Sequence, residues 1–169
     1  MKKLLTVLLA LMLSLALTFA CVGCDYNNNT PTCQHTTQIG TCQNCGVFQN
    51  QSDYNTIKNK LSEASNLVDI ALRSISSIPN NGNDYTQRLI NAILSAQPQI
   101  DDAKKCLNTA IAVCNNYSEL TTILNSLYRA KTALPTSLSN GTSIQNYLSG
   151  LRTFVTEIAS ARTQLVYIK

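Results

Sequence analysis

The cysteines and the single histidine are the residues best suited to chemistry in this chain. Cys33, His35, Cys42 and Cys45 lie within one short stretch. Zinc favours thiolate and imidazole ligands, and the two-residue gap between Cys42 and Cys45 suits a zinc knuckle or a redox dithiol. However, Cys33 and His35 are too close for the usual second ligand pair, and no β-α-β pattern surrounds the redox-like motif. Structural disulfides are therefore the favoured interpretation, with a zinc site or a redox site as alternatives.

The sequence contains seven cysteines, an odd number. If Cys106 and Cys114 lie on one helix, they are about 12 Å apart along its axis, which a disulfide cannot span. Each then needs a partner nearer the N-terminus, so we predict one or two disulfides that join the N-terminal region to a helix of the following domain. The candidate cysteines are Cys24, Cys33, Cys42, Cys45, Cys106 and Cys114.

The first twenty residues have the three parts of a secretory signal peptide. Lys2 and Lys3 form a cationic start, the segment 4–20 is uncharged and rich in Leu and Ala, and the small residue Ala20 precedes Cys21. The apolar segment is at the lower limit for a membrane span, and no cationic cluster follows it. We therefore expect export, with removal of residues 1–20.

The segment Leu17-Thr18-Phe19-Ala20-Cys21 resembles the signal of bacterial lipoproteins, in which a small residue precedes the cysteine that receives lipid. It departs from the strict form at Thr18, where Leu or a close relative is usual. The resemblance implies a diacylglyceryl group on the Cys21 thiol and fatty acyl chains such as palmitate, which anchor stably when there are two or more. Cys24 is the second candidate, because Gly23 is suitable before it but the position three residues upstream is not aliphatic.

The number of cysteines also favours Cys21 as the lipid site, because lipid on Cys21 leaves an even number of cysteines to pair. Ordinary cleavage after Ala20 is the alternative, since Thr18-Phe19-Ala20 is a passable small-x-small site. The protein would then be freely secreted, would carry its disulfides, and would act on another cell or surface.

The composition limits the kinds of partner. Charged residues make up only 13% of the chain, and the formal net charge is +4, which falls to +2 without Lys2 and Lys3. No basic stripe is interleaved with aromatic residues, so nucleic acid is not an expected partner. The expected partners are membrane lipid, through the acyl chains, and another protein of the cell envelope.

Two regions are expected to carry these cysteines. Residues 21–51 are predicted to be an irregular polar tether, because Asn, Pro and Gly residues favour turns there. Residues 52–169 are predicted to be an all-α domain, an antiparallel bundle of about four helices. Such a bundle could also associate with itself, because the same apolar seam serves internal and external packing.

The apolar spacing defines the helices. From Tyr54 to Ile78, apolar residues follow one another at intervals of three and four, which is a heptad seam, with Ser52 as the predicted N-cap. Asp84 is predicted to cap a second helix, with a kink or a break near Pro98. We expect Ser118 to cap the third helix, although the apolar spacing nearly continues from the second. Pro135 is predicted to end the third helix, and Thr142 or Ser143 to begin the fourth.

The bundle region contains few residues for catalysis. The only histidine is His35, so no imidazole in the bundle can serve as a general base. No Glu-x-x-His pair is present for a di-metal centre, and Glu63, Glu119 and Glu157 are isolated carboxylates that we expect to be solvated. We therefore predict neither an enzyme nor a bound cofactor. The tyrosines expected to pack in the core or an interface are Tyr54, Tyr85, Tyr117, Tyr128, Tyr147 and Tyr167.

Overall fold

The computed structural model describes residues 24–25, 32–33, 38–42, 48–138 and 143–168. The chain divides into two units, which are described separately. The first unit comprises Met1–Thr36 and Cys42–Val47, and the second comprises Thr37–Thr41 and Phe48–Lys169. The predicted signal peptide, Cys21, His35 and Cys45 all lie outside the described residues.

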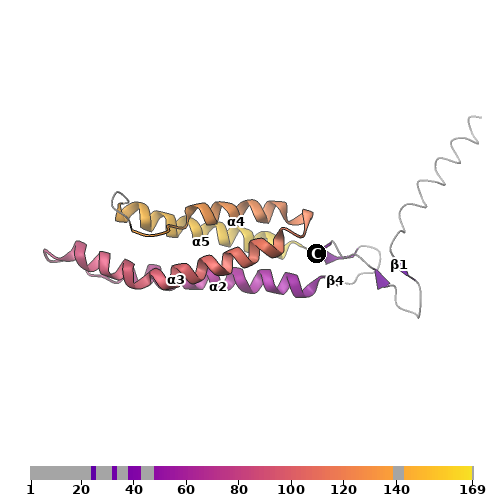
Figure 1. Cartoon of the computed structure of the whole chain (residues 1–169), viewed down its shortest axis with the longest axis horizontal. Coiled ribbons are helices and arrows are strands. Elements are labelled where there is room, and N and C mark those ends of the chain that lie inside the picture. Colours follow the sequence, from indigo (N-terminus) through magenta and orange to yellow (C-terminus); the bar gives the residue numbers. More distant parts are fainter. Residues whose placement is uncertain (1–23, 26–31, 34–37, 43–47, 139–142, 169) are drawn as a thin grey trace, which may run out of the picture. The chain divides into compact units, whose positions relative to one another are not determined.

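Four α-helices make up most of the described part of the second unit (Figure 1). They are α2 (Gln51–Ser76), α3 (Tyr85–Cys114), α4 (Thr121–Ala133) and α5 (Ile144–Val166). Helix α2 packs along α3 and α4 packs along α5, while α2 also contacts α5 and α3 contacts α4. Successive helices run in opposite directions, so the predicted antiparallel four-helix bundle is confirmed.

The buried face of α2 follows the predicted seam. Ile57, Leu61 and Val68 are fully buried, as is Ala64 between them. The buried face of α3 is wider than a single heptad seam, because this helix contacts both α2 and α4. Beyond such a seam, it also buries Ile93, Cys106 and Ile111.

Helix α3 passes through Pro98 without a break. A proline cannot donate a backbone hydrogen bond to the carbonyl four residues earlier, which here belongs to Leu94. Both Pro98 and Leu94 are exposed, so water can supply the missing donor. Of the kink or break predicted at Pro98, the break is therefore wrong, because the proline sits on the solvent side of a helix whose other side is packed. The kink stays a prediction.

The N-cap of α2 differs from the prediction. The helix begins at Gln51, so Ser52 lies inside it, and the preceding residue Asn50 has a left-handed backbone with φ of 52°. The Asn50 side chain donates through Nδ2 to the carbonyl of Gln38, at 2.5 Å. The start of α2 is thus set by the contact of Asn50 with an earlier segment, which local sequence patterns do not reveal.

The remaining connections follow the sequence more closely. The chain turns between α3 and α4, with Tyr117 extended before a short 3₁₀ helix at Ser118–Leu120, so one longer helix is excluded. Leu134 has an extended backbone before Pro135, which ends α4 as predicted. The Ser143 side chain accepts a hydrogen bond from the backbone N–H of Asn146 and caps α5.

Two short hairpins occur in the region predicted to be irregular. Strand β1 (Cys24–Asp25) pairs with β2 (Thr32–Cys33), and β3 (Gly40–Thr41) pairs with β4 (Phe48–Gln49), both antiparallel. Two-residue strands are too short to show an alternating pattern, so periodicity could not predict them.

Gly150 marks a close approach of α5 to the end of α4. A Cβ atom at this position would lie 2.5 Å from the carbonyl oxygen of Ala133. Although alanine favours helices by about 1 kcal/mol over glycine, we predict that Gly150→Ala lowers the free energy of unfolding, by about 1–3 kcal/mol, because backbone must shift. Urea unfolding monitored by circular dichroism measures this change. Ser149→Ala, on the exposed side of α5, is the control, and an equally stable Gly150→Ala variant would contradict the prediction.

Candidate functional site

The β3–β4 hairpin joins one end of the bundle, which we call the hairpin end. It comprises the hairpin, the start of α2, the α3–α4 turn and the last turns of α5. The backbone N–H of Ile39 donates to Glu119 Oε1 at 2.7 Å, and the Ile39 side chain is buried in the core. A hydrogen bond to a carboxylate is stronger than one between neutral groups, so Glu119 holds the hairpin on the bundle.

A second polar contact at this end joins α2 to the α3–α4 turn. The Tyr117 hydroxyl donates to Asp53 Oδ2 at 2.5 Å. Tyr117 is only 4% exposed. Burial, and then the Asp53 carboxylate that accepts its hydrogen bond, raise the pKa of Tyr117 to about 12. The phenol therefore stays protonated at neutral pH and acts as a hydrogen-bond donor that fixes the turn.

An open groove lies beside these contacts, between the first turns of α2 and the last turns of α5. Its volume is about 380 Å³. We call it the α2–α5 groove, and its lining residues are Tyr54, Lys58, Ala159, Arg162, Thr163, Leu165 and Val166. The ring of Phe48, from β4, contacts the edge of Tyr54 with 5.1 Å between centroids. The groove thus combines an aromatic wall, an aliphatic floor and two cations.

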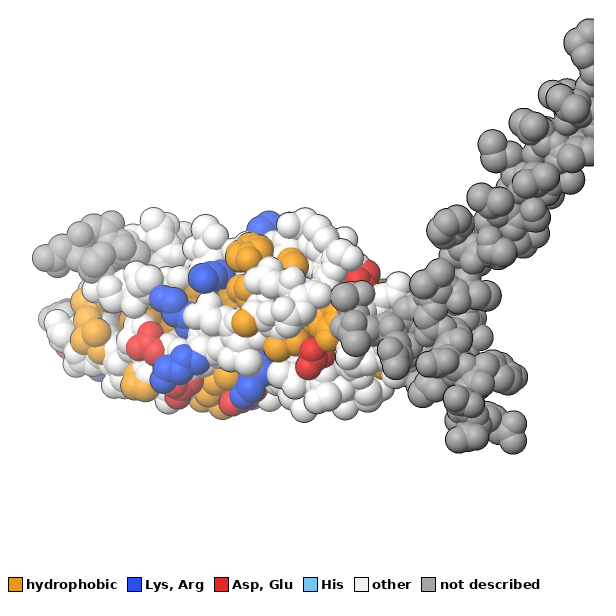
Figure 2. Space-filling view, turned by 45° about the vertical axis from the view of Figure 1, so that its right-hand side comes forward, with side chains coloured by type: hydrophobic (Ala, Val, Ile, Leu, Met, Phe, Trp, Pro, Cys, Tyr) orange, Lys and Arg blue, Asp and Glu red, His pale blue; other side chains and the backbone are white. Residues whose placement is uncertain are grey.

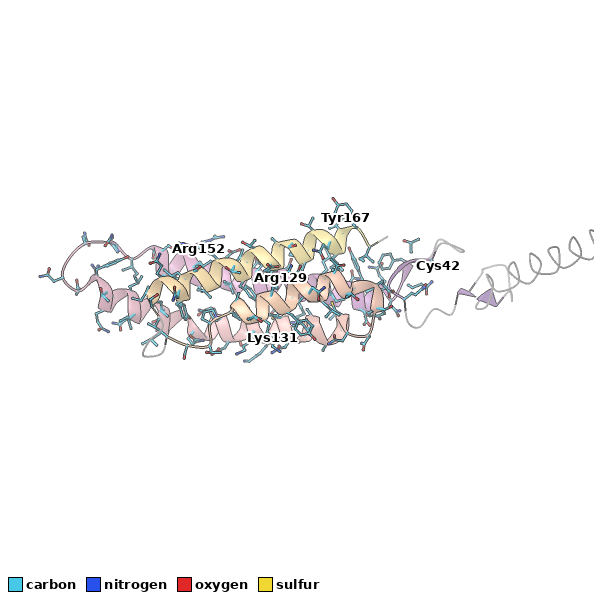
Figure 3. All side chains as sticks on the ribbon, turned by 90° about the horizontal axis from the view of Figure 1, so that it is seen from above. Cys42, Arg129, Lys131, Arg152 and Tyr167 are labelled. Atoms are coloured by element: carbon cyan, nitrogen blue, oxygen red, sulfur yellow. The ribbon has the colours of Figure 1, made fainter. Side chains whose placement is uncertain are left out.

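Large apolar side chains stand exposed at the same end. Val166 is 66% exposed and Tyr167 is 73% exposed, and Figure 3 shows Tyr167 projecting from the end of α5. Figure 2 shows basic, acidic and hydrophobic side chains interspersed on one face of the bundle, within a largely uncharged surface. Among the described residues, neither Lys58 nor Arg162 forms an ion pair, whereas Lys60, Arg88, Lys105 and Arg129 each do.

A buried polar cluster between α4 and α5 has a structural role. Ser126 is fully buried, and its Oγ accepts a hydrogen bond from Arg129 at 3.0 Å. Arg129 also forms an ion pair with Glu157 at 3.0 Å, and Gln164 donates to Ser160 on its own helix. The Arg129–Glu157 ion pair joins α4 to α5, as does a hydrogen bond of 3.5 Å from Gln164 to Ser126 Oγ, so these two contacts help to fix the register of the helices.

The predicted disulfide partners Cys106 and Cys114 are both free thiols in the structure. Cys106 faces α2, where Glu63 interacts with its thiol, and burial is the main cause that raises its pKa. Cys114 is fully buried, which raises its pKa to about 12. The structure therefore contains no link from the N-terminal region to Cys106 or Cys114, and both side chains are part of the packed interior.

The other predicted chemical residues are only partly described. Cys24 and Cys33 lie in β1 and β2, Cys42 is buried, and His35 and Cys45 of the zinc alternative lie outside the described residues. Among the side chains that the structure describes, no three His, Cys, Asp or Glu gather closely enough to hold a metal ion. The same part of the chain contains no helix long and apolar enough to span a membrane.

Sequence reasoning missed the hairpin end. Glu119 is exposed, as expected of a solvated carboxylate, but it also accepts a hydrogen bond from Ile39. Glu157 is only partly exposed and pairs with Arg129 on α4. Asp53 gave no signal beyond its place near a helix start, where acidic residues are common. Lys58 and Lys60 lie close together in the sequence, but only the fold shows that they differ. Lys60 pairs with Glu63, whereas Lys58 lines the groove. Of the tyrosines, Tyr117 and Tyr147 are buried as predicted, whereas Tyr128 and Tyr167 are exposed.

Comparisons with family models, with curated proteins and with solved structures found no match for this chain.

The buried Tyr117 and Tyr147 are expected to make the bundle less stable at high pH. Burial raises the pKa of both, from 10.0 to about 12. Since the folded pKa lies above the unfolded value, their contribution is complete below pH 10 and is lost as the pH rises towards 12. We predict that stability falls over this range and that Tyr117→Phe makes the fall less steep, by at most about 1.4 kcal/mol per pH unit. Urea unfolding at pH 9.5 and 11.5 measures the change in the free energy of unfolding, and Tyr167→Phe, at an exposed position, is the control. An unchanged slope for Tyr117→Phe would contradict the assignment.

Proposed function

We propose that this protein is an exported lipoprotein, anchored on the extracytoplasmic face of a membrane by acyl chains on Cys21. Its helical bundle is then a non-catalytic binding or structural module that the tether holds near the lipid. The observation that carries the proposal is the N-terminal border, where a cationic start and the apolar segment 4–20 are followed directly by Cys21.

The register of β1 with β2 supports Cys21, rather than Cys24, as the lipid site. Cys24 and Cys33 are direct partners across this antiparallel pair. Opposed positions have Cα atoms about 4.5–5.5 Å apart, within the range of about 4.4–6.8 Å that a disulfide allows. We therefore propose a Cys24–Cys33 disulfide, formed when an extracytoplasmic thiol–disulfide oxidant takes up two electrons and two protons from the thiols. Cys24 then has no thiol to offer to a lipid.

The carboxylates of the bundle support a structural module. Asp53 and Glu119 hold the hairpin end together, and Glu157 joins α5 to α4 through Arg129. Glu63 pairs with Lys60 at 2.7 Å. Asp53, Glu119 and Glu157 thus join separate elements of the bundle, whereas Glu63 pairs within its own helix.

Metabolic labelling with a clickable fatty acid tests the lipid site. We predict that the wild-type protein is labelled and sediments with membranes, and that Cys21→Ala removes both the label and the sedimentation, because the acylated thiol is lost. Cys24→Ala is the matched control and should keep the label. Label that persists in Cys21→Ala would contradict the proposal, and an unlabelled wild-type protein in the culture medium would favour free secretion.

Non-reducing peptide mapping tests the cysteine assignment. We predict a linked peptide that contains Cys24 and Cys33, because their strand register brings the backbones within disulfide reach. Cys106 and Cys114 should alkylate without reductant once the protein is denatured, since both are thiols in the structure. A peptide that links Cys106 or Cys114 to another cysteine would contradict this assignment.

A further inference from the structure

We infer that the hairpin end of the bundle rests on an anionic lipid surface, with the α2–α5 groove and Tyr167 towards the headgroups. This inference rests on the proposed function, because the acyl anchor brings the bundle to the membrane. It goes further by assigning the surface of the bundle that meets the lipid and the side chains that recognise it.

The path of the chain favours this end. Sixteen peptide units separate Cys21 from Thr37, where the second unit begins, so the connection spans at most about 55 Å. The chain enters the bundle through β3 and β4, directly before α2. The opposite end lies farther along the bundle by the length of α3, whose 30 residues extend about 45 Å. An anchor at Cys21 therefore brings the hairpin end to the membrane first.

The charges that line the groove suit acidic headgroups. Lys58 and Arg162 are exposed on the two sides of the groove, and within the described residues neither forms an ion pair. The nearby carboxylates Asp53 and Glu119 keep their negative charge, because their donors, Tyr117 and the backbone of Ile39, are neutral, but neither carboxylate lines the groove. A Lys or Arg near an anionic membrane surface contributes about 1 kcal/mol of attraction. Two such cations would orient a tethered bundle, although they are too few to bind it to a membrane alone.

The apolar side chains at the same edge suit the membrane interface. Val166 and Tyr167 are the most exposed large hydrophobic residues among those described, at 66% and 73%. Arg162 and Val166 lie one helical turn apart on α5, as Tyr54 and Lys58 do on α2. Tyrosine is enriched at headgroup level, where its ring is apolar and its hydroxyl remains wet. The edge thus combines aromatic, aliphatic and basic side chains in the way that an interfacial surface requires.

A single tryptophan provides the test, because the chain has none of its own. The acylated full chain carrying Tyr167→Trp is reconstituted into phosphatidylglycerol-containing vesicles, with or without brominated lipid. We predict fluorescence at least about twofold lower with brominated lipid, because a ring at headgroup level contacts the quencher. Leu94→Trp is the matched control. Leu94 is 56% exposed on α3, twenty residues before the hairpin end, about 30 Å along the helix. Its fluorescence should not change.

The role of the cations is tested in the Tyr167→Trp background. Lys58→Ala with Arg162→Ala should shift the contact equilibrium about 30-fold towards the free state and so remove most of the quenching. Lys131→Ala with Arg152→Ala removes the same charge elsewhere and should leave the quenching unchanged; Figure 3 shows both residues away from Tyr167. Circular dichroism confirms that each variant is folded. Absent quenching, equal quenching at positions 94 and 167, or equal effects of the two double variants would overturn the inference.

The mass of the same sample separates this inference from the proposed function. An acylated chain without quenching at position 167 leaves the lipoprotein proposal intact and overturns the inference alone. If the mature chain carries no acyl group, the lipoprotein proposal fails, and the inference, which rests on the anchor, fails with it.

Discussion

Burial of one apolar stripe on each helix is the constraint on which the rest of the structure depends. No helix can cover its own stripe, so α2 packs on α3, α4 packs on α5, and the two pairs close on each other. Because few side chains are charged, the surface offers few ion pairs, and packing carries most of the stability. The close fit at Gly150 and the buried thiol of Cys114 both follow from this dense interior.

At the hairpin end, hydrogen bonds between segments add to this apolar packing. Glu119, Asp53 and Asn50 each reach a partner on another segment, and together they fix the hairpin, the α3–α4 turn and the start of α2. Fixing these elements leaves the α2–α5 groove beside them as an open surface. A rigid support next to an open, basic and apolar edge suits a domain that meets a membrane at one end.

The sequence predicted what depends on local periodicity and missed what depends on distant contacts. The seam from Ile57 to Ile75 and the cap at Ser143 could be predicted because their signals repeat within a few residues. Ser52 failed as a cap because the start of α2 is set by the contact of Asn50 with Gln38. The wider core face of α3, including Cys106, requires knowing that α3 has two neighbours.

The central claim is that the protein matures by losing its leader and gaining lipid on Cys21, with Cys24 paired to Cys33. The intact mass of protein extracted from membranes, measured with and without reductant, tests it most directly. The account predicts a chain of residues 21–169 that carries added acyl mass and gains two hydrogens on reduction of one disulfide. An unmodified chain that still begins at Met1, with the same mass before and after reduction, would contradict it.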